Sequence, residues 1–200
     1  MSHSSEDVAV ERHPLEPFVP VHARLLMLGS FPPPQKRWSM YFFYPNLQND
    51  MWRIFGTLFF GDKDYFVVKE EKRFDKDKLV DFLTAKGVAL YDTATAVKRL
   101  LGNASDAALE VVEPTDVFAL LRQLPECQAV VTTGQKATDT LVALLKVKQP
   151  PIGESVPFDF EGRAMRLYRM PSSSRAYPMK LEKKAAVYGS MLQDLGLLES

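Results

Sequence analysis

The sequence predicts an α/β domain of three layers (α/β/α), in which a central, mainly parallel sheet of four strands lies between two layers of helices. Short apolar runs alternate with longer segments of helical periodicity along most of the chain. Most of these runs are apolar at consecutive positions, which is typical of parallel strands buried on both faces. With 200 residues, of which 46% are hydrophobic, the chain is also long enough to bury the core that this fold needs.

Four segments are expected to form the strands. The first is "ARLLMLG" (23–29), and "VALYDT" (88–93) and "AVVTTG" (129–134) follow it. The fourth strand is expected near 164–170 within "RAMRLYRMPS", where apolar and polar residues alternate up to a Pro-Ser turn. Because helical segments separate these runs, the strands are expected to pair mainly in parallel.

Five segments are expected to form helices: 49–61, 75–87, 114–125, 135–147 and 180–198. Asn49 or Asp50 can accept hydrogen bonds at the start of the first helix. Asp75 and Gly87 are suitable residues for the two ends of the second helix. Pro114 and Thr115 are expected to open the third.

The chain is expected to form one domain over residues 19–200, preceded by a flexible arm over residues 1–18. The N-terminal residues form no apolar signal core, and no apolar run approaches the roughly 18 residues that span a membrane. The single cysteine, Cys127, excludes an internal disulfide framework and suits a cytoplasmic location. A net charge of zero disfavours DNA binding by bulk charge but permits a local basic patch.

Common catalytic motifs are missing. The sequence contains no G-x-G-x-x-G after a strand and no Walker loop. All three histidines lie before the first predicted strand, so a Ser–His–Asp triad would need one of them to fold back over the sheet. With a single cysteine besides, a zinc site is not expected. We therefore expect no metal and no cofactor.

Polar or proline-rich loops follow all four predicted strands: "GSFPPP", "YDTAT", "TTGQK" and "MPSSSRAY". In open α/β sheets, ligands bind beyond the carboxyl ends of the strands. Each loop taken alone is compatible with an ordinary surface turn. Four such loops at one edge favour a binding site there.

These segments resemble motifs of the uracil-DNA glycosylase superfamily, above all its mismatch-specific and hypoxanthine-DNA glycosylase-like branches. The turn Gly29-Ser30-Phe31-Pro32, the aromatic pair Phe43-Tyr44 and the run Asn49-Asp50-Met51-Trp52 resemble the first motif region. "GVALYDTATAV", "VVTTGQKATDTL" and "RMPSSSRAYP" then follow in the order of the family. The resemblance extends over roughly residues 23–195.

The resemblance implies a DNA glycosylase, which extrudes a damaged or mismatched base from double-stranded DNA and hydrolyses its N-glycosidic bond. Asn49 would hold the attacking water, and Asp92 would accept a hydrogen bond from the base and is the second catalytic candidate. The residues expected to bind the base are Gly29, Ser30, Phe31, Phe43 and Tyr44. The residues expected to bind DNA are Gly134, Lys136, Ser172, Ser173, Ser174, Arg175 and Tyr177. A monomer without membrane association is expected.

Three positions depart from the family pattern. Asp92 stands where the family carries an Asn that reads the base. Phe31 stands where uracil- and mismatch-specific enzymes carry an Asp or Asn that activates or positions the water. Met170 stands where the Pro-Ser loop usually begins with His or Asn. These departures leave two alternatives open: a catalytically inactive protein that binds DNA or a nucleobase, and a hydrolase of small nucleosides.

Most of the candidate residues also have a structural alternative. Asn49 could only cap a helix, and Asp92 could cap a helix over 93–100. At least one ring of the run Phe42, Phe43 and Tyr44 is expected to pack in the core. The three serines at 172–174 could form a polar turn before the last helix, and Lys136 could face solvent.

Overall fold

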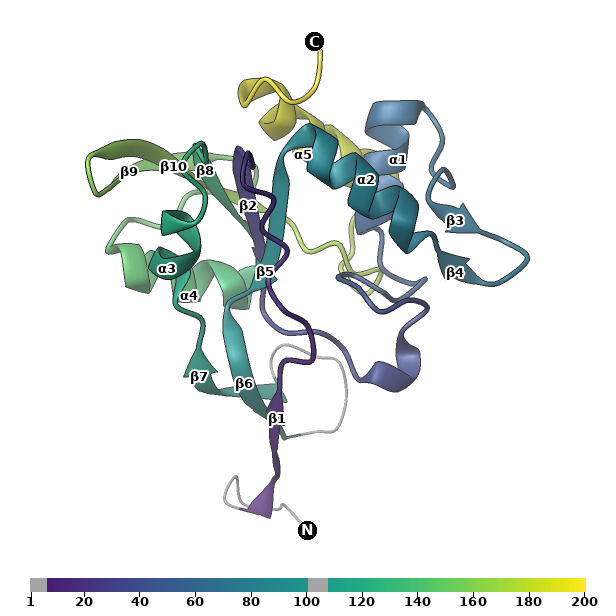
Figure 1. Ribbon diagram of the computed structural model, residues 1–200, viewed down its shortest axis with the longest axis horizontal. Helices are drawn as coiled ribbons and strands as arrows, with labels where there is room; N and C mark the ends of the chain where they lie inside the picture. Colours follow the sequence, from purple (N-terminus) through teal and green to yellow (C-terminus); the bar gives the residue numbers. More distant parts are fainter. Residues whose placement is uncertain (1–6, 101–107) are drawn as a thin grey trace.

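The computed structural model describes residues 7–100 and 108–200, and a five-stranded sheet lies at its centre (Figure 1). The strand order is β5-β2-β8-β10-β9. The parallel strands are β5 (Val88–Asp92), β2 (Leu25–Gly29), β8 (Ala129–Thr133) and β10 (Arg163–Met170). They coincide with the four predicted segments, so the predicted α/β class is confirmed. Every residue of β2, β5 and β8 is buried, which explains their continuous apolar runs.

The sheet has a fifth strand that the sequence did not indicate. β9 (Ser155–Phe160) lies at the edge and pairs antiparallel with β10. It contains Pro157, which has no N–H to donate to a neighbouring strand and is therefore tolerated at an edge. The prediction of four strands is thus one strand short.

Helices cover both faces of the sheet, as predicted. Figure 1 shows α3 and α4 on one side and α1, α2 and α5 on the other. The helices are α1 (Met51–Phe60), α2 (Lys76–Lys86), α3 (Val117–Arg122), α4 (Gln135–Leu145) and α5 (Leu181–Asp194). α3 begins later than expected, because Pro114 ends a strand and the Asp116 carboxylate accepts from the N–H of Ala119. No described helix is long and apolar enough to cross a membrane.

A second, antiparallel sheet lies beyond the carboxyl end of β5 (Figure 1). Its strands are β1 (Val10–Arg12), β6 (Ala94–Arg99) and β7 (Leu109–Pro114). Residues 94–99 therefore form a strand and not a helix, which removes the alternative that Asp92 caps a helix there. The remaining elements are the pair β3 (Val67–Val68) and β4 (Arg73–Phe74) and a short 3-10 helix, η2 (Gln35–Arg37).

The N-terminal segment is packed on the domain from Val10 onward. β1 pairs with β6, the backbone N–H of His13 donates to the carbonyl of Thr95 (2.8 Å), and Phe18 forms a β-bridge with Leu90. The expected flexible arm over residues 1–18 is therefore wrong for residues 10–18. Their backbone groups find partners on two strands, which a composition argument could not show. Residues 1–6 of that arm lie outside the described residues.

Aromatic rings join the helices to the loop that follows β2. Trp52, in the first turn of α1, is fully buried, and its indole N–H donates to the carbonyl of Phe43 (2.9 Å). Phe55 on α1 meets Phe82 on α2 with ring centroids 6.1 Å apart. The loop before α1 is thus fixed to the core at the edge of the sheet where the four predicted loops gather.

Candidate functional site

A cavity of about 660 Å³ opens at the carboxyl edge of the parallel strands. The last residues of β2, β5 and β8 (Gly29, Asp92 and Thr133) line it together with the loops after β2 and β10. The predicted site residues that line it are Gly29, Ser30, Phe31, Phe43, Tyr44, Asn49, Asp92, Ser172, Ser173, Ser174, Arg175 and Tyr177. Residues separated by up to 148 positions in the chain, Gly29 and Tyr177, are thus brought to one place.

Two predicted residues, Gly134 and Lys136, do not line this cavity. Gly134 follows β8 with a positive φ of 91°, and α4 begins directly after it. The ammonium group of Lys136 donates to the carbonyl of Leu109, at the start of β7, over 2.8 Å. Lys136 therefore holds the second sheet against α4. Met170 does not line the cavity either, because it is buried in the core.

Three oxygen atoms converge on Gly29 at the floor of the cavity. A Cβ atom at this position would lie 2.8 Å from Asp92 Oδ1, 3.3 Å from the Tyr44 hydroxyl and 3.5 Å from Thr133 Oγ1. The two hydroxyls are also 3.2 Å from each other. Only glycine leaves room for this approach, so Gly29 makes the polar floor.

Aromatic rings form one wall. Phe31 and Phe43 line the cavity while being largely buried, and Phe42 is packed in the core against Trp52 and Phe18. Phe42 therefore packs in the core, as expected for at least one of the three rings, and Phe43 also belongs to the core while lining the cavity. Tyr44 has φ of 48°, an uncommon left-handed conformation for a bulky residue. Such backbone strain is often found at functional sites.

Asn49 lies two residues before the first residue of α1, Met51. Its side-chain oxygen accepts from the backbone N–H of Met51 over 3.0 Å, so its expected structural alternative, a hydrogen bond at the helix N-terminus, is present. The guanidinium of Arg53 also contacts the Asn49 carbonyl (3.3 Å). Asn49 also lines the cavity, and its amide nitrogen can donate hydrogen bonds.

The loop after β10 is fixed to the residues before α1 by backbone hydrogen bonds. Asp50 donates its N–H to the carbonyl of Ser173 (2.8 Å), and Arg175 donates its N–H to the carbonyl of Gln48 (3.2 Å). Within the loop, the hydroxyls of Ser172 and Ser174 accept from the N–H groups two residues ahead. These hydroxyls keep an O–H that can donate to a ligand.

A buried ion network lies beneath this loop. The Asp50 carboxylate contacts Arg175 Nε and Lys184 Nζ, each over 3.1 Å. Lys184, on α5, has a side chain with no exposed surface, and its ammonium also donates to the carbonyl of Ser174 (2.8 Å). Sequence reasoning missed Lys184. The available signal was its position on the face of α5 that also carries the buried Tyr188.

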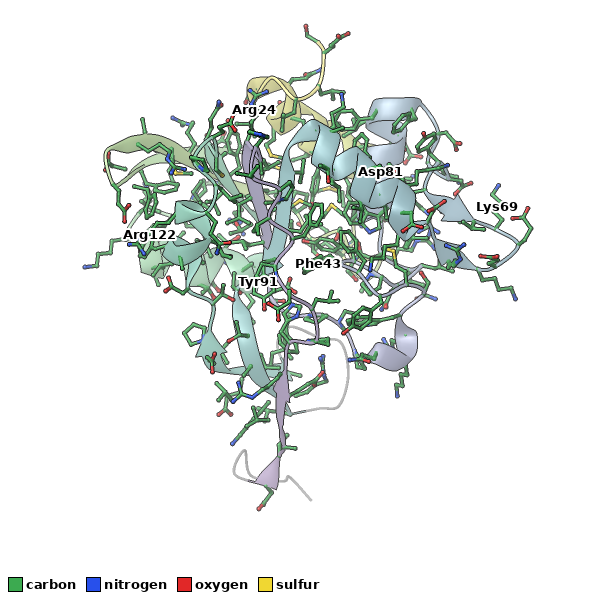
Figure 2. The ribbon with its side chains drawn as sticks, in the orientation of Figure 1. Arg24, Phe43, Lys69, Asp81, Tyr91 and Arg122 are labelled. Carbon is green, nitrogen blue, oxygen red and sulfur yellow. The ribbon has the colours of Figure 1, made fainter. Side chains whose placement is uncertain are left out.

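A second missed residue is His13, which does fold back over the sheet. Its Nε2 lies 2.7 Å from Asp92 Oδ2, and the exposed fractions of the two side chains are 1% and 9%. The His13 ring stacks on Tyr91 with centroids 4.6 Å apart. Figure 2 labels Tyr91 beside Phe43, whose ring centroid is 6.2 Å away. Burial raises the pKa of Tyr91 to about 12, and the Asp92 carboxylate adds to the effect.

Fold and cavity together define a three-layer α/β/α domain with a ring- and oxygen-lined cavity at the carboxyl edge of its sheet. Within the described residues, no group of three or more His, Cys, Asp or Glu is placed to hold a metal ion.

The domain is similar to a solved structure. No family model and no curated protein matches the sequence. One similar structure is the solution NMR structure of a protein from Methanosarcina acetivorans, described as a putative uracil DNA glycosylase. The TM-score is 0.61 at 18% sequence identity, and the match covers 94% of this chain and 99% of that chain. The chain therefore has a uracil-DNA-glycosylase-like fold, and at this identity the likeness establishes the fold alone.

Proposed function

We propose that the protein is a DNA glycosylase of the hypoxanthine- or mismatch-specific type, which extrudes a base from duplex DNA and hydrolyses its N-glycosidic bond. The candidate bases are hypoxanthine, uracil and a mismatched base. The observation that carries the proposal is that rings, an amide, an acceptor carboxylate and a serine-rich loop meet in one cavity. The fold shared with the M. acetivorans protein supports the same class.

Each part of the cavity has a role in this proposal. Phe31 and Phe43 would enclose a flat base, and the Asp92 carboxylate would accept a hydrogen bond from its edge. Asn49 would hold the attacking water through its amide nitrogen. The loop from Ser172 to Tyr177 would contact the phosphates through hydroxyl, N–H and guanidinium groups. None of the described lining residues is a lysine, so an amine nucleophile is not part of the proposal and the enzyme is monofunctional.

A second candidate function rests on Phe31. This ring lines the cavity at the position where related enzymes would carry a water-activating group. A protein that retains the base-binding cavity without hydrolysis would bind DNA or a nucleobase only. A nucleoside hydrolase has less support, because the half-exposed Arg175 at the cavity suits a phosphate. For both the glycosylase and the binding protein without hydrolysis, we propose that the protein is a monomer in the cytoplasm.

The test is incubation with duplexes carrying uracil, hypoxanthine, xanthine or a thymine mismatch, followed by detection of abasic sites. We expect abasic sites from at least one duplex. Asn49→Ala should lower single-turnover excision at least about a hundredfold, the scale of losing a positioned catalytic group, with little change in DNA binding. Asn49→Ser is the control, because a serine hydroxyl can still accept from the Met51 N–H at the start of the helix but is too short to hold the water.

The outcomes separate the candidates. If both Asn49 variants lose excision while Asn49→Ser keeps the stability of the unmodified protein, the loss reflects the amide and not the hydrogen bond to Met51. If Asn49→Ala retains full activity, another group positions the water, and Asp92 is the next to test. If the unmodified protein binds DNA but releases no base, the second candidate function is correct.

A further inference from the structure

We propose that His13 is a positioning residue that makes Asp92 a fixed, acceptor-only partner for a ring N–H of the bound base. The inference rests on the proposed function only in taking the ligand to be a nucleobase. It adds a residue outside the cavity and a rule of selectivity to the site. His13 itself is not among the residues that line the cavity.

The hydrogen bonds of the His13 ring determine which nitrogen carries its proton. The backbone N–H of Leu15 donates to Nδ1 over 3.1 Å, so Nδ1 is an acceptor. A neutral imidazole with an acceptor at Nδ1 carries its proton on Nε2. His13 therefore donates this proton to Asp92 Oδ2, which lies 2.7 Å away.

The direction of this bond decides what Asp92 can offer to a ligand. Because the proton between the two side chains belongs to His13, the Asp92 carboxylate needs none and both its oxygens act as acceptors. Oδ2 faces His13, whereas Oδ1 faces Gly29 at the floor of the cavity. An amide at this position could be turned to present either a donor or an acceptor, which the carboxylate cannot do.

The groups around Oδ1 complete the pattern. The hydroxyls of Tyr44 and Thr133 approach the same point beside Gly29, and each can donate or accept. A base edge with a ring N–H next to a carbonyl oxygen matches one fixed acceptor and a hydroxyl donor. A bare ring nitrogen at the same place would face the Oδ1 lone pairs, which leaves two buried acceptors without a donor and is strongly unfavourable.

His13 is well suited to hold this orientation. It is almost completely buried and stacked on Tyr91, and its ring edge meets Phe31 with centroids 5.3 Å apart. The strand β1 and the Leu15 N–H fix its backbone and ring on either side. The N-terminal segment thus sets the selectivity of a cavity that it does not line.

The experiment compares hypoxanthine with 1-deazahypoxanthine, which has the same shape but a C–H in place of N1–H. Binding of the two free bases to the full chain is measured by NMR titration. The unmodified protein should prefer hypoxanthine about tenfold or more, because the analogue leaves the buried acceptor Oδ1 without a donor. His13→Leu, which keeps apolar bulk without a donor, should bring the ratio close to one. His13→Gln, whose amide N–H can reach Asp92, should restore the preference to within about threefold.

The inference is overturned if the unmodified protein binds neither base or binds both equally, or if folded His13→Leu keeps the preference. Should His13→Leu fail to fold, Asp92→Asn is the deciding variant, because its amide can turn a donor toward the ligand and should also lose the preference. Retention of the preference by Asp92→Asn then overturns the inference.

Two further results distinguish a failure of the proposed function from a failure of the role of His13. Discrimination between the free bases without any abasic site in duplex DNA refutes the glycosylase and supports the role of His13. Equal excision of hypoxanthine and 1-deazahypoxanthine from duplex DNA overturns the role of His13 and supports the glycosylase.

Discussion

At the scale of single residues, the site depends on the absence of a Cβ atom at Gly29. Gly29 does not adopt a left-handed backbone, so alanine is conformationally acceptable there. What alanine would disturb is the space shared with Asp92 Oδ1, only 2.8 Å from the Cβ it would add. The requirement for glycine is therefore a requirement for the approach of the carboxylate and the two hydroxyls, not for a turn.

We expect Gly29→Ala to lower base excision and to destabilise the fold by about 1–3 kcal/mol, the usual cost of overpacking. Urea denaturation and single-turnover excision measure the two effects. In the background of Asp92→Ala the contact is absent, so the same substitution should cost clearly less stability. An equal cost in both backgrounds would show that the methyl group does not displace Asp92.

The sequence placed Gly29 and Asp92 correctly at the carboxyl edge because both directly end apolar runs. It could not reveal His13, since the hydrogen bond to Asp92 joins residues 79 positions apart and depends on how the N-terminal segment folds back. The same holds for Lys184 and Asp50, which are 134 positions apart. Tertiary pairs of this kind leave no local pattern.

At the scale of elements, the loop from Ser172 to Tyr177 lies between α1 and α5. Backbone bonds from Asp50 and Arg175 and the buried ammonium of Lys184 hold it in place before any ligand binds. Arg175 anchors the loop through the contact of its Nε with Asp50, and it can also contact a ligand because 51% of its side chain is exposed. The loop therefore presents a cation at the rim of the cavity in a fixed position.

Arg175→Ala should weaken DNA binding and reduce the salt dependence of the affinity by about one ion, with a modest effect on excision at saturating DNA. The fold should survive, because Asp50 keeps Lys184 as a partner. Binding measured over a range of salt concentrations tests this expectation. Arg122→Ala is the matched control, since Arg122 is also half-exposed and paired with a carboxylate, that of Glu161, but does not line the cavity. Equal effects of both variants would contradict a specific role for Arg175.

The elements themselves follow from the sequence where local patterns decide them. Buried parallel strands and the capped helix α2 were placed correctly, because continuous apolar runs and residues such as Asp75 and Gly87 act locally. β9, with its Pro157, and the second sheet were missed. Their strands are partly exposed, and β7 carries exposed residues at 111–114, so their apolar pattern is weak. Pairing with distant strands, not propensity, makes them strands.

At the scale of the whole molecule, a net charge of zero means that any affinity for DNA has to come from local groups such as Arg175 and the serine loop. The fold places these groups at one edge of the sheet and leaves the opposite edge to the chain connections. The buried core extends to the opposite edge of the sheet, where Cys127 lies just before β8 and its buried thiol donates to the carbonyl of Ala129 (3.3 Å).

This core should make the domain sensitive to alkali. Burial raises the pKa of the Cys127 thiol from 9.0 to about 11. The neutral thiol is favoured in the folded state, so its contribution to stability is complete below pH 9 and is lost as the pH rises through 11. At the upper end of this range the loss amounts to about 2 kcal/mol.

Cys127→Ala removes the ionisable group without adding a polar atom. Urea denaturation at intervals from pH 8 to about 11 should therefore show a steeper fall in the free energy of unfolding for the unmodified protein than for Cys127→Ala. Tyr91, with its raised pKa, contributes equally to both proteins and cancels in the comparison. Parallel curves for the two proteins would contradict the prediction, because they would mean that folding does not raise the pKa of the thiol.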